Sequence, residues 1–214
     1  MLDDLYPNNQ IYGYFYNKKR IHSLILINHE YQEIVIIFRG SQYLGEWFKN
    51  FIFFEKNIPF DKNFSIHKGI LDLYLNDEIN KNIVYILKNL FYYFPHYNKI
   101  ITGHSKASIH SILLALELTN TLNIKYNYDI YTFGAPPLLN YNLANHLLSY
   151  NNIKVYNIFN EYDIISSLPI PCKYQIGTEI ILKENIKLNK HNEPFKNKFN
   201  IKLNNFYLSI IGHD

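Results

Sequence analysis

The sequence has one cysteine, Cys172, among its 214 residues, so a disulfide within the chain is excluded. A lone thiol of this kind is typical of a protein in a reducing compartment. Arginine is also scarce, since Arg20 and Arg39 are the two in the chain and lysine supplies the other basic charges behind the formal net charge of +3. Because no arginine-rich helix or finger motif occurs, nucleic acid is not an expected partner.

Long apolar runs are missing as well. None approaches the roughly 18 residues of a membrane-spanning helix, so we expect no transmembrane segment. The opening stretch MLDDLYPNNQ is acidic and polar, and it lacks the basic and apolar regions of a signal peptide. These features predict a protein of the cytoplasm or of the interior of a host cell.

Apolar and aromatic residues, in contrast, are plentiful. Hydrophobic residues make up 48% of the chain and aromatic residues 17%, which argues against disorder. A chain of this length buries roughly 70% of the surface of its unfolded state. We therefore expect a single globular domain over residues 1–214.

The patterning predicts alternating strands and helices. Two β-rich runs, Ile21 to Asn28 and Glu33 to Arg39, flank a short polar turn and predict a pair of neighbouring strands. The alternation of strand and helix patterns over residues 70–160 indicates a mostly parallel sheet. The remaining expected elements are strands over residues 99–102, 128–133, 154–160 and 173–182, helices over 79–90, 109–118 and 138–150, and a polar loop over 183–198.

The stretch from Ile100 to Ser108, IITGHSKAS, has the outline of a strand, a tight turn and a helix. Ser105 follows two residues after Gly103, and a serine on such a strained turn presents its hydroxyl above the sheet. The N–H groups at the start of the helix favour a negatively charged oxygen there. The full pattern G-x-S-x-G has Ala107 at its last position, and this methyl costs roughly 1 to 3 kcal/mol if the backbone does not shift. An ordinary polar turn before a helix is the alternative for this stretch taken alone.

An acidic residue and a late histidine complete a possible catalytic set. Asp163 comes directly after the expected strand over 154–160, at the end of the sheet where catalytic groups gather. With His213 the order along the chain is Ser, Asp, His, which is the order of α/β-hydrolases. Alternatives stay open: the competing acids are Glu161 and Asp129, and the competing bases are His191 and His110. We expect structural roles for His67 and His104.

An aromatic segment over residues 42–54 contains the single tryptophan of the chain. Leu44 and Phe48 are four residues apart, as are Trp47 and Phe51, so a short helix there would have an aromatic face. Such a face is either part of the core or a mobile flap that covers a site and meets lipid when open.

Six motifs in order carry a family resemblance: IVIIFRGS, EWFKNF, IHKGIL, IITGHSKAS, YTFGAPPL and NEYDIISSLP. In this order the sequence resembles the class 3 lipases, of the fungal triacylglycerol lipase type, over about residues 33–169. The resemblance implies an α/β-hydrolase fold with a mostly parallel central sheet and helices on both faces. It also implies hydrolysis of carboxylic esters of lipids, such as acylglycerols, through an acyl-enzyme intermediate, with no metal or organic cofactor.

Carried over to this sequence, the family pattern makes Ser105 the nucleophile, Asp163 the carboxylate and His213 the general base. Ser41 and Lys106 would supply the donors of an oxyanion hole. Within the segment over 42–54, the residues expected to form a lid are Tyr43, Leu44, Trp47 and Phe48.

The expected partner is therefore a lipid or ester substrate at a membrane or droplet surface, on which the protein would lie peripherally. The region before the FRGS motif is shorter than in secreted fungal lipases, which indicates a shortened version of the family. Two alternatives stay open. The excess of lysine favours a phospholipase A1, whereas Ala107 and the penultimate position of His213 favour a weak or inactive hydrolase fold that binds lipid or a protein. The sequence does not predict the oligomeric state.

Overall fold

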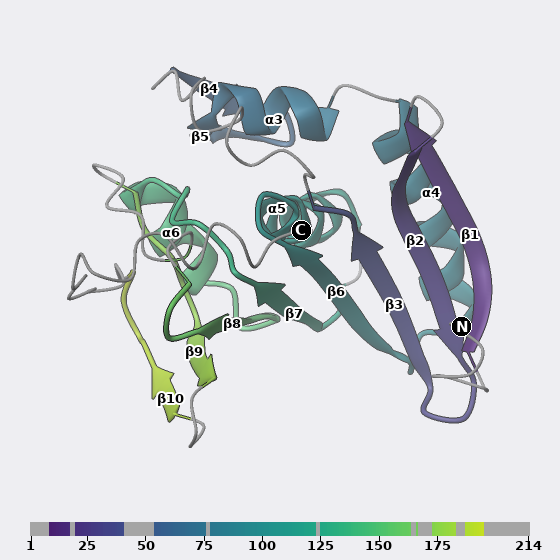
Figure 1. Cartoon of the computed structure of the whole chain (residues 1–214). Helices are drawn as coiled ribbons and strands as arrows, with labels where there is room; N and C mark the ends of the chain where they lie inside the picture. Colours follow the sequence, from purple (N-terminus) through teal and green to yellow (C-terminus); the bar gives the residue numbers. More distant parts are fainter. Residues whose placement is uncertain are drawn as a thin grey trace.

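The computed structural model describes residues 9–17, 20–40, 54–75, 78–122, 125–163, 166, 173–182 and 187–194. Eight strands form one sheet in the order β1-β2-β3-β6-β7-β8-β9-β10, and β4 and β5 form a separate pair (Figure 1). The strands of the large sheet are β1 (Asn9–Asn17), β2 (Arg20–Asn28), β3 (Glu33–Phe38), β6 (Asn98–His104), β7 (Tyr128–Phe133), β8 (Ile153–Asn160), β9 (Thr178–Leu182) and β10 (Lys187–Lys190). The other elements are β4 (Glu55–Ile58), β5 (Asp61–His67), α3 (Lys68–Leu75), α4 (Glu78–Tyr93), α5 (Ala107–Thr121) and α6 (Tyr141–Leu148).

The central strands run parallel. Neighbouring pairs from β3 through β6, β7 and β8 to β9 are parallel, whereas β1, β2 and β10 join the sheet in antiparallel pairs. The mostly parallel sheet that the sequence predicts is thus confirmed. In such a sheet the carboxyl ends of the parallel strands meet at one edge, where ligands bind in open α/β folds.

One face of the sheet is buried and forms part of the hydrophobic core. Every second residue of the central strands is buried there, and Ile36, Ile101 and Ile130 are fully buried in one cluster with apolar side chains of α4, α5 and α6. α5 is buried on nearly all sides, because α3 and the β4–β5 hairpin cover the side that faces away from the sheet (Figure 1). The Tyr74 hydroxyl of α3 donates to Glu117 of α5 at 2.6 Å.

The opposite face carries the alternate residues, which are only partly buried. Thr102, Tyr131 and Tyr156 lie in one row across β6, β7 and β8, and the two tyrosine rings stack with centroids 5.0 Å apart. The helices of the described residues bury their apolar side chains in the core on the first face. The described part of the chain therefore shows helices on one face of the sheet, where the sequence analysis expects them on both.

Two edge strands differ from the sequence expectation. β1 pairs with β2, although no strand is expected over residues 9–17, and β10 lies within the stretch expected to be a loop. An edge strand is half solvated, so its sequence does not show the apolar run of a buried strand. Its place in the sheet is decided by pairing with its neighbour.

Candidate active site

The turn between β6 and α5 consists of Ser105 and Lys106. Ser105 has a φ of 56°, in the left-handed region that residues other than glycine seldom adopt. Its backbone N–H donates to the carbonyl of Phe133, at the end of β7, with a distance of 2.7 Å. A left-handed serine between a central strand and a buried helix is the geometry of a nucleophile elbow.

Gly103 allows α5 to start so close to β6. A Cβ on Gly103 would overlap the backbone carbonyl of Ala107, and Ser108 Oγ donates to the Gly103 carbonyl at 2.9 Å. Ala107 itself is fully buried in the core. The structure accommodates its extra methyl, because the tight contact involves the backbone of Ala107 rather than its side chain.

The hydroxyl of Ser105 is buried, and among the described residues it has no hydrogen-bond partner. Lys106 holds the N-cap position of α5 with a helical backbone, and the first N–H groups of a helix have no partner within it. A negative charge that develops beside Ser105 therefore faces the positive end of the α5 dipole. Burial lowers the pKa of the Lys106 ammonium group.

Asp163 lies at the same edge of the sheet, after β8. The Asp163 N–H donates to the Asn160 carbonyl at 2.9 Å, and Ser166 Oγ donates to the Asp163 carbonyl at 3.0 Å. A Cβ built on Gly134 would lie only 2.7 Å from Asp163 Oδ2. Gly134 directly follows Phe133, whose carbonyl accepts the hydrogen bond from the Ser105 N–H. The end of β7 therefore contacts both the serine and the Asp163 carboxylate.

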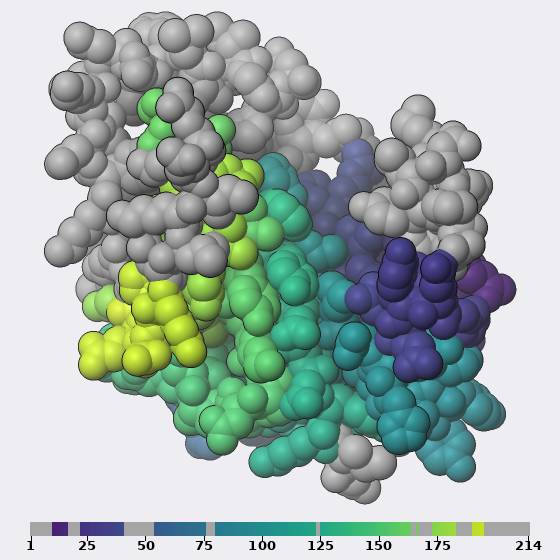
Figure 2. Space-filling view, turned by 90° about the horizontal axis from the view of Figure 1, so that it is seen from below, coloured from purple at the N-terminus to yellow at the C-terminus, as the bar shows by residue number. Residues whose placement is uncertain are grey.

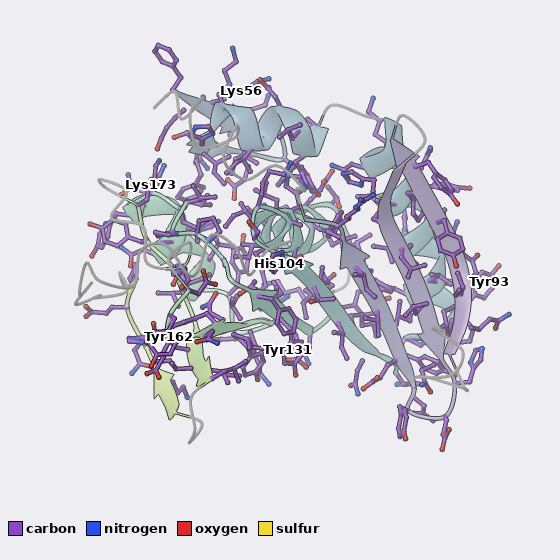
Figure 3. The ribbon with its side chains drawn as sticks, viewed as in Figure 1. Lys56, Tyr93, His104, Tyr131, Tyr162 and Lys173 are labelled. Carbon is purple, nitrogen blue, oxygen red and sulfur yellow. The ribbon has the colours of Figure 1, made fainter. Side chains whose placement is uncertain are left out.

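His104 lies beside the elbow at the end of β6 (Figure 3). A Cβ on Gly40 would lie 3.1 Å from its Nδ1, so Gly40 leaves room for the ring, whereas a Cβ on Gly134 would lie at an ordinary contact distance of 3.6 Å from its Nε2. Neither glycine is among the site residues expected from the sequence. The available signal was their position, because each lies within two residues of the end of a strand that the sequence predicts.

The competing acids lie differently from Asp163. Asp129 pairs with Ile100 near the start of β7, away from the carboxyl ends of the parallel strands. Glu161 is close to the correct edge, but its N–H donates to Leu182 of β9 at 3.4 Å, on the side away from β7. Of the three acids, Asp163 is therefore the one that the structure places against the end of β7 beside the elbow.

The competing bases also have other surroundings. His110 is buried in α5 beside the rings of His22, Phe38 and Tyr74, and burial lowers its pKa to about 3, which makes it a poor general base. His191 Nε2 lies 2.7 Å from Glu179 Oε2, where β9 pairs with β10 at the edge of the sheet.

Several expected site residues fall outside the described residues. They are Ser41 and His213, together with the expected lid residues Tyr43, Leu44, Trp47 and Phe48. Phe54, the last residue of the aromatic segment, is described and is 68% exposed just before β4. His67 is buried at the end of β5.

In the part of the chain that the structure describes, no group of three or more His, Cys, Asp or Glu side chains is arranged to hold a metal ion. None of the described helices is long and apolar enough to cross a membrane.

A mostly parallel sheet with a left-handed serine between its central strand and a buried helix defines an α/β-hydrolase. Within that class the particular family follows from the sequence. The chain belongs to the class 3 lipases, because the sequence model of the family described as Lipase (class 3) matches residues 35–172.

Two curated relatives and one solved structure illustrate the similarity. The lipase of Rhizomucor miehei is 31% identical over 138 residues, which cover 64% of this chain and 37% of that protein. The secreted mono- and diacylglycerol lipase 1 of Fusarium solani is 25% identical over 152 residues, or 71% of this chain and 44% of that protein. The crystal structure of a lipase from Rhizopus microsporus var. chinensis has a TM-score of 0.79 and 21% identity, and the match covers 91% of this chain and 69% of that one. The chain thus spans less than half the length of the two curated relatives.

Proposed function

We propose that this chain is a serine hydrolase that cleaves carboxylic esters of lipids, such as acylglycerols, through a covalent acyl-enzyme. The observation that carries the proposal is Ser105, with its left-handed backbone and its buried hydroxyl. Backbone strain of this kind persists only where the surrounding fold imposes it, and it clusters at active sites. Membership of the class 3 lipases supports a lipid ester as the substrate.

In the proposed mechanism, Ser105 Oγ attacks the ester carbonyl carbon while His213 accepts its proton. Asp163 orients the imidazole and stabilises its charged form. The backbone N–H of Lys106 and the donors of Ser41 bind the tetrahedral oxyanion, and loss of one such donor typically costs on the order of 3 kcal/mol of barrier. His213 then protonates the leaving alcohol, and a water molecule that it activates releases the fatty acid.

We further propose that the aromatic segment over residues 42–54 acts as a lid that meets a lipid surface through Tyr43, Leu44, Trp47 and Phe48. The exposure of Phe54 beside β4 supports an accessible aromatic segment at this point of the chain. The lid predicts that the rate of hydrolysis of a short-chain ester rises sharply when the substrate passes its solubility limit. A rate that saturates smoothly through that limit contradicts the lid.

The function is tested by labelling the purified protein with a fluorophosphonate and measuring its intact mass, followed by peptide mapping. We expect one adduct on Ser105, lost in Ser105→Ala together with ester hydrolysis, and reduced labelling in Asp163→Asn and His213→Ala. Ser111→Ala is the matched control, because Ser111 is buried in α5, the helix that follows Ser105, and its hydroxyl donates to the Ala107 carbonyl. If a folded, monodisperse sample forms no adduct, the serine is not activated and a lipid-binding role replaces the catalytic one.

A further inference from the structure

The two edges of the large sheet differ in their chemistry. β1 and β10 lie on opposite sides of the molecule, purple and yellow in Figure 2. β10 has four residues and both begins and ends with lysine, and short edge strands with lysine resist pairing with other chains. β1 has nine residues with no charge and no proline, and among the described strands only β2 pairs with it. The outer edge of β1 therefore has none of these protections.

The exposed side of β1 is a row of tyrosines. Exposure alternates without a break from Gln10 to Tyr16, although the pairing with β2 is irregular at two points. Tyr12, Tyr14 and Tyr16 are 51%, 42% and 57% exposed, and the rings of Tyr14 and Tyr16 lie 6.3 Å apart. These rings lie on one side of an unprotected strand edge, where an added strand would cover them.

Gly13 lies at the centre of β1. Its φ is not positive, and a Cβ there would meet only the ring of Phe15, at an ordinary contact distance of 3.7 Å. A Cβ would therefore fit at Gly13, and the glycine follows a register shift between Ile11 and Gly13 in the pairing of β1 with β2. A glycine within a strand often marks a bulge or the close approach of another backbone, and at Gly13 the small residue leaves room for both.

We propose that β1 pairs antiparallel with β1 of a second copy of this chain, about a two-fold axis at Gly13. In this register Tyr12 lies opposite Tyr14 of the second copy, Ile11 opposite Phe15, and Gln10 opposite Tyr16. On the exposed face Tyr12 meets Tyr14, on the other face the apolar side chains of Ile11 and Phe15 meet, and no like charges are opposed. The pairing joins the two eight-stranded sheets into one continuous sheet.

Helix α4 belongs to the same interface. It contacts β1 and lies behind it (Figure 1), so the two-fold axis brings the α4 helices of both copies beside one another. A nine-residue strand is about 30 Å long, so pairing along its edge alone buries a narrow strip of surface. Because a specific interface buries about 1,000 Å² or more, the dimer also needs the contact between the α4 helices. We therefore expect a reversible dimer with a dissociation constant in the micromolar range. The catalytic edge at β6, β7 and β8 is not part of this contact.

The test is sedimentation equilibrium of the full chain over a wide range of concentrations. We expect a monomer–dimer equilibrium that Tyr12→Lys/Tyr14→Lys weakens about tenfold or more, because two pairs of lysines then face each other. Tyr12→Lys/Tyr14→Glu changes the same positions but pairs opposite charges, so it should dimerise as tightly as the wild type. Tyr31→Lys/Tyr141→Lys adds the same charge at two exposed tyrosines off this edge and should also match the wild type.

Three results overturn the proposal. The wild type could remain a monomer at every concentration, as it would if another segment covered β1. The lysine–glutamate variant could be as weak as the double lysine variant, which would rule out the register about Gly13. The control pair could weaken the dimer as much as the double lysine variant, which would place the interface elsewhere.

Discussion

At the scale of single residues, Gly134 is the position of the site where a larger side chain is least tolerated. It has a φ of 54°, and a methyl there would lie 2.7 Å from Asp163 Oδ2. Gly134→Ala should displace the carboxylate and lower ester hydrolysis at least about tenfold, since small shifts of catalytic groups are costly. It should also lower the free energy of unfolding by about 1 kcal/mol through backbone strain.

Initial rates and thermal unfolding measure both effects. Gly13→Ala is the matched control, because a Cβ on Gly13 meets only the ring of Phe15 and φ is not positive there. That variant should keep the wild-type rate. A Gly134→Ala enzyme with full activity would show that the Asp163 carboxylate does not need its present position.

Lys99 is a buried, basic residue at the start of β6. Its Nζ donates to the Pro95 carbonyl at 2.5 Å and lies 4.7 Å from the ring centroid of Tyr126. Burial lowers the pKa of Lys99 from 10.5 to about 8. Between these two values the unfolded chain binds more protons than the folded one, so Lys99 makes stability rise with pH in that range.

Lys99→Met should remove this rise. We expect the free energy of unfolding of the wild type, relative to the variant, to increase by about 2 kcal/mol from about pH 8 to about pH 10. Urea unfolding at closely spaced pH values measures it, and the titrating tyrosines cancel because both proteins contain them. Parallel pH profiles would mean that Lys99 does not lose its proton in the folded protein within this range.

At the scale of elements, the elbow depends on how α5 meets β6. Ala107→Gly creates the full G-x-S-x-G pattern, yet the close contact is already made by Gly103 and the backbone of Ala107. We expect no gain in hydrolysis and a loss of about 1 kcal/mol of stability, because glycine disfavours helix. Gly103→Ala, compared in the same assays, should cost more stability, since its methyl overlaps backbone. A large gain of activity in Ala107→Gly would show that the methyl does distort the elbow.

The buried elements of this fold are predictable from local pattern. Strand β7 matches its expected residues 128–133, and the strand expected over 154–160 is observed one residue longer as β8. Their apolar runs are continuous or alternate clearly, because the core covers them. The edge strand β1 shows no such run, since its pairing with β2 and not its own burial places it in the sheet.

The candidate site likewise contains residues that local pattern predicts and residues that only contacts between strands explain. Ser105 and Asp163 follow strands in the sequence, so their positions could be predicted from local pattern. Gly40 and Gly134 act through space, by leaving room for His104 and Asp163, which come from other strands. No local pattern encodes such a contact between strands.

At the scale of the whole molecule, the Glu55 carboxylate accepts hydrogen bonds from segments that lie far apart in the sequence. It accepts hydrogen bonds from Lys173 Nζ at 2.5 Å and Asn140 Nδ2 at 3.0 Å, and from the hydroxyl of Ser65. Asn140 also caps α6, where its side chain accepts from the N–H of Leu143 at 2.9 Å. The β4–β5 hairpin, α6 and the segment before β9 thus meet at one carboxylate.

Burial acts to raise the pKa of Glu55, but Lys173, Ser65 and Asn140 outweigh it and the pKa is below 4.5. The stabilisation from these contacts is fully present above the pKa that Glu55 has in the unfolded chain. It is lost as the pH falls through the lower pKa of Glu55 in the folded protein. Lys173→Met should therefore lower the free energy of unfolding by about 1 kcal/mol at neutral pH, and by less in acid. Urea unfolding from neutral pH down to about pH 3 measures this difference.

Lys56→Met provides the control. Lys56 also forms a salt bridge, 2.6 Å from Asp72, but both side chains are largely exposed (Figure 3 labels Lys56 and Lys173). Its loss should change stability by less than about 0.5 kcal/mol at any pH. Equal effects of the two substitutions would mean that the junction at Glu55 contributes no more than a surface ion pair.

The parallel pairing of β3 with β6 joins two parts of the chain that lie far apart in sequence, so we expect it to form late in folding. β1, β2 and β3 form a meander with short turns, whereas β3 reaches β6 only after residues 39–97 have closed into a loop. Closing this loop costs about 2 kcal/mol more chain entropy than closing the turn between β2 and β3. Since Gly40 and His104 meet where this pair ends, refolding should regain catalytic competence in its last and slowest phase, after the meander has formed.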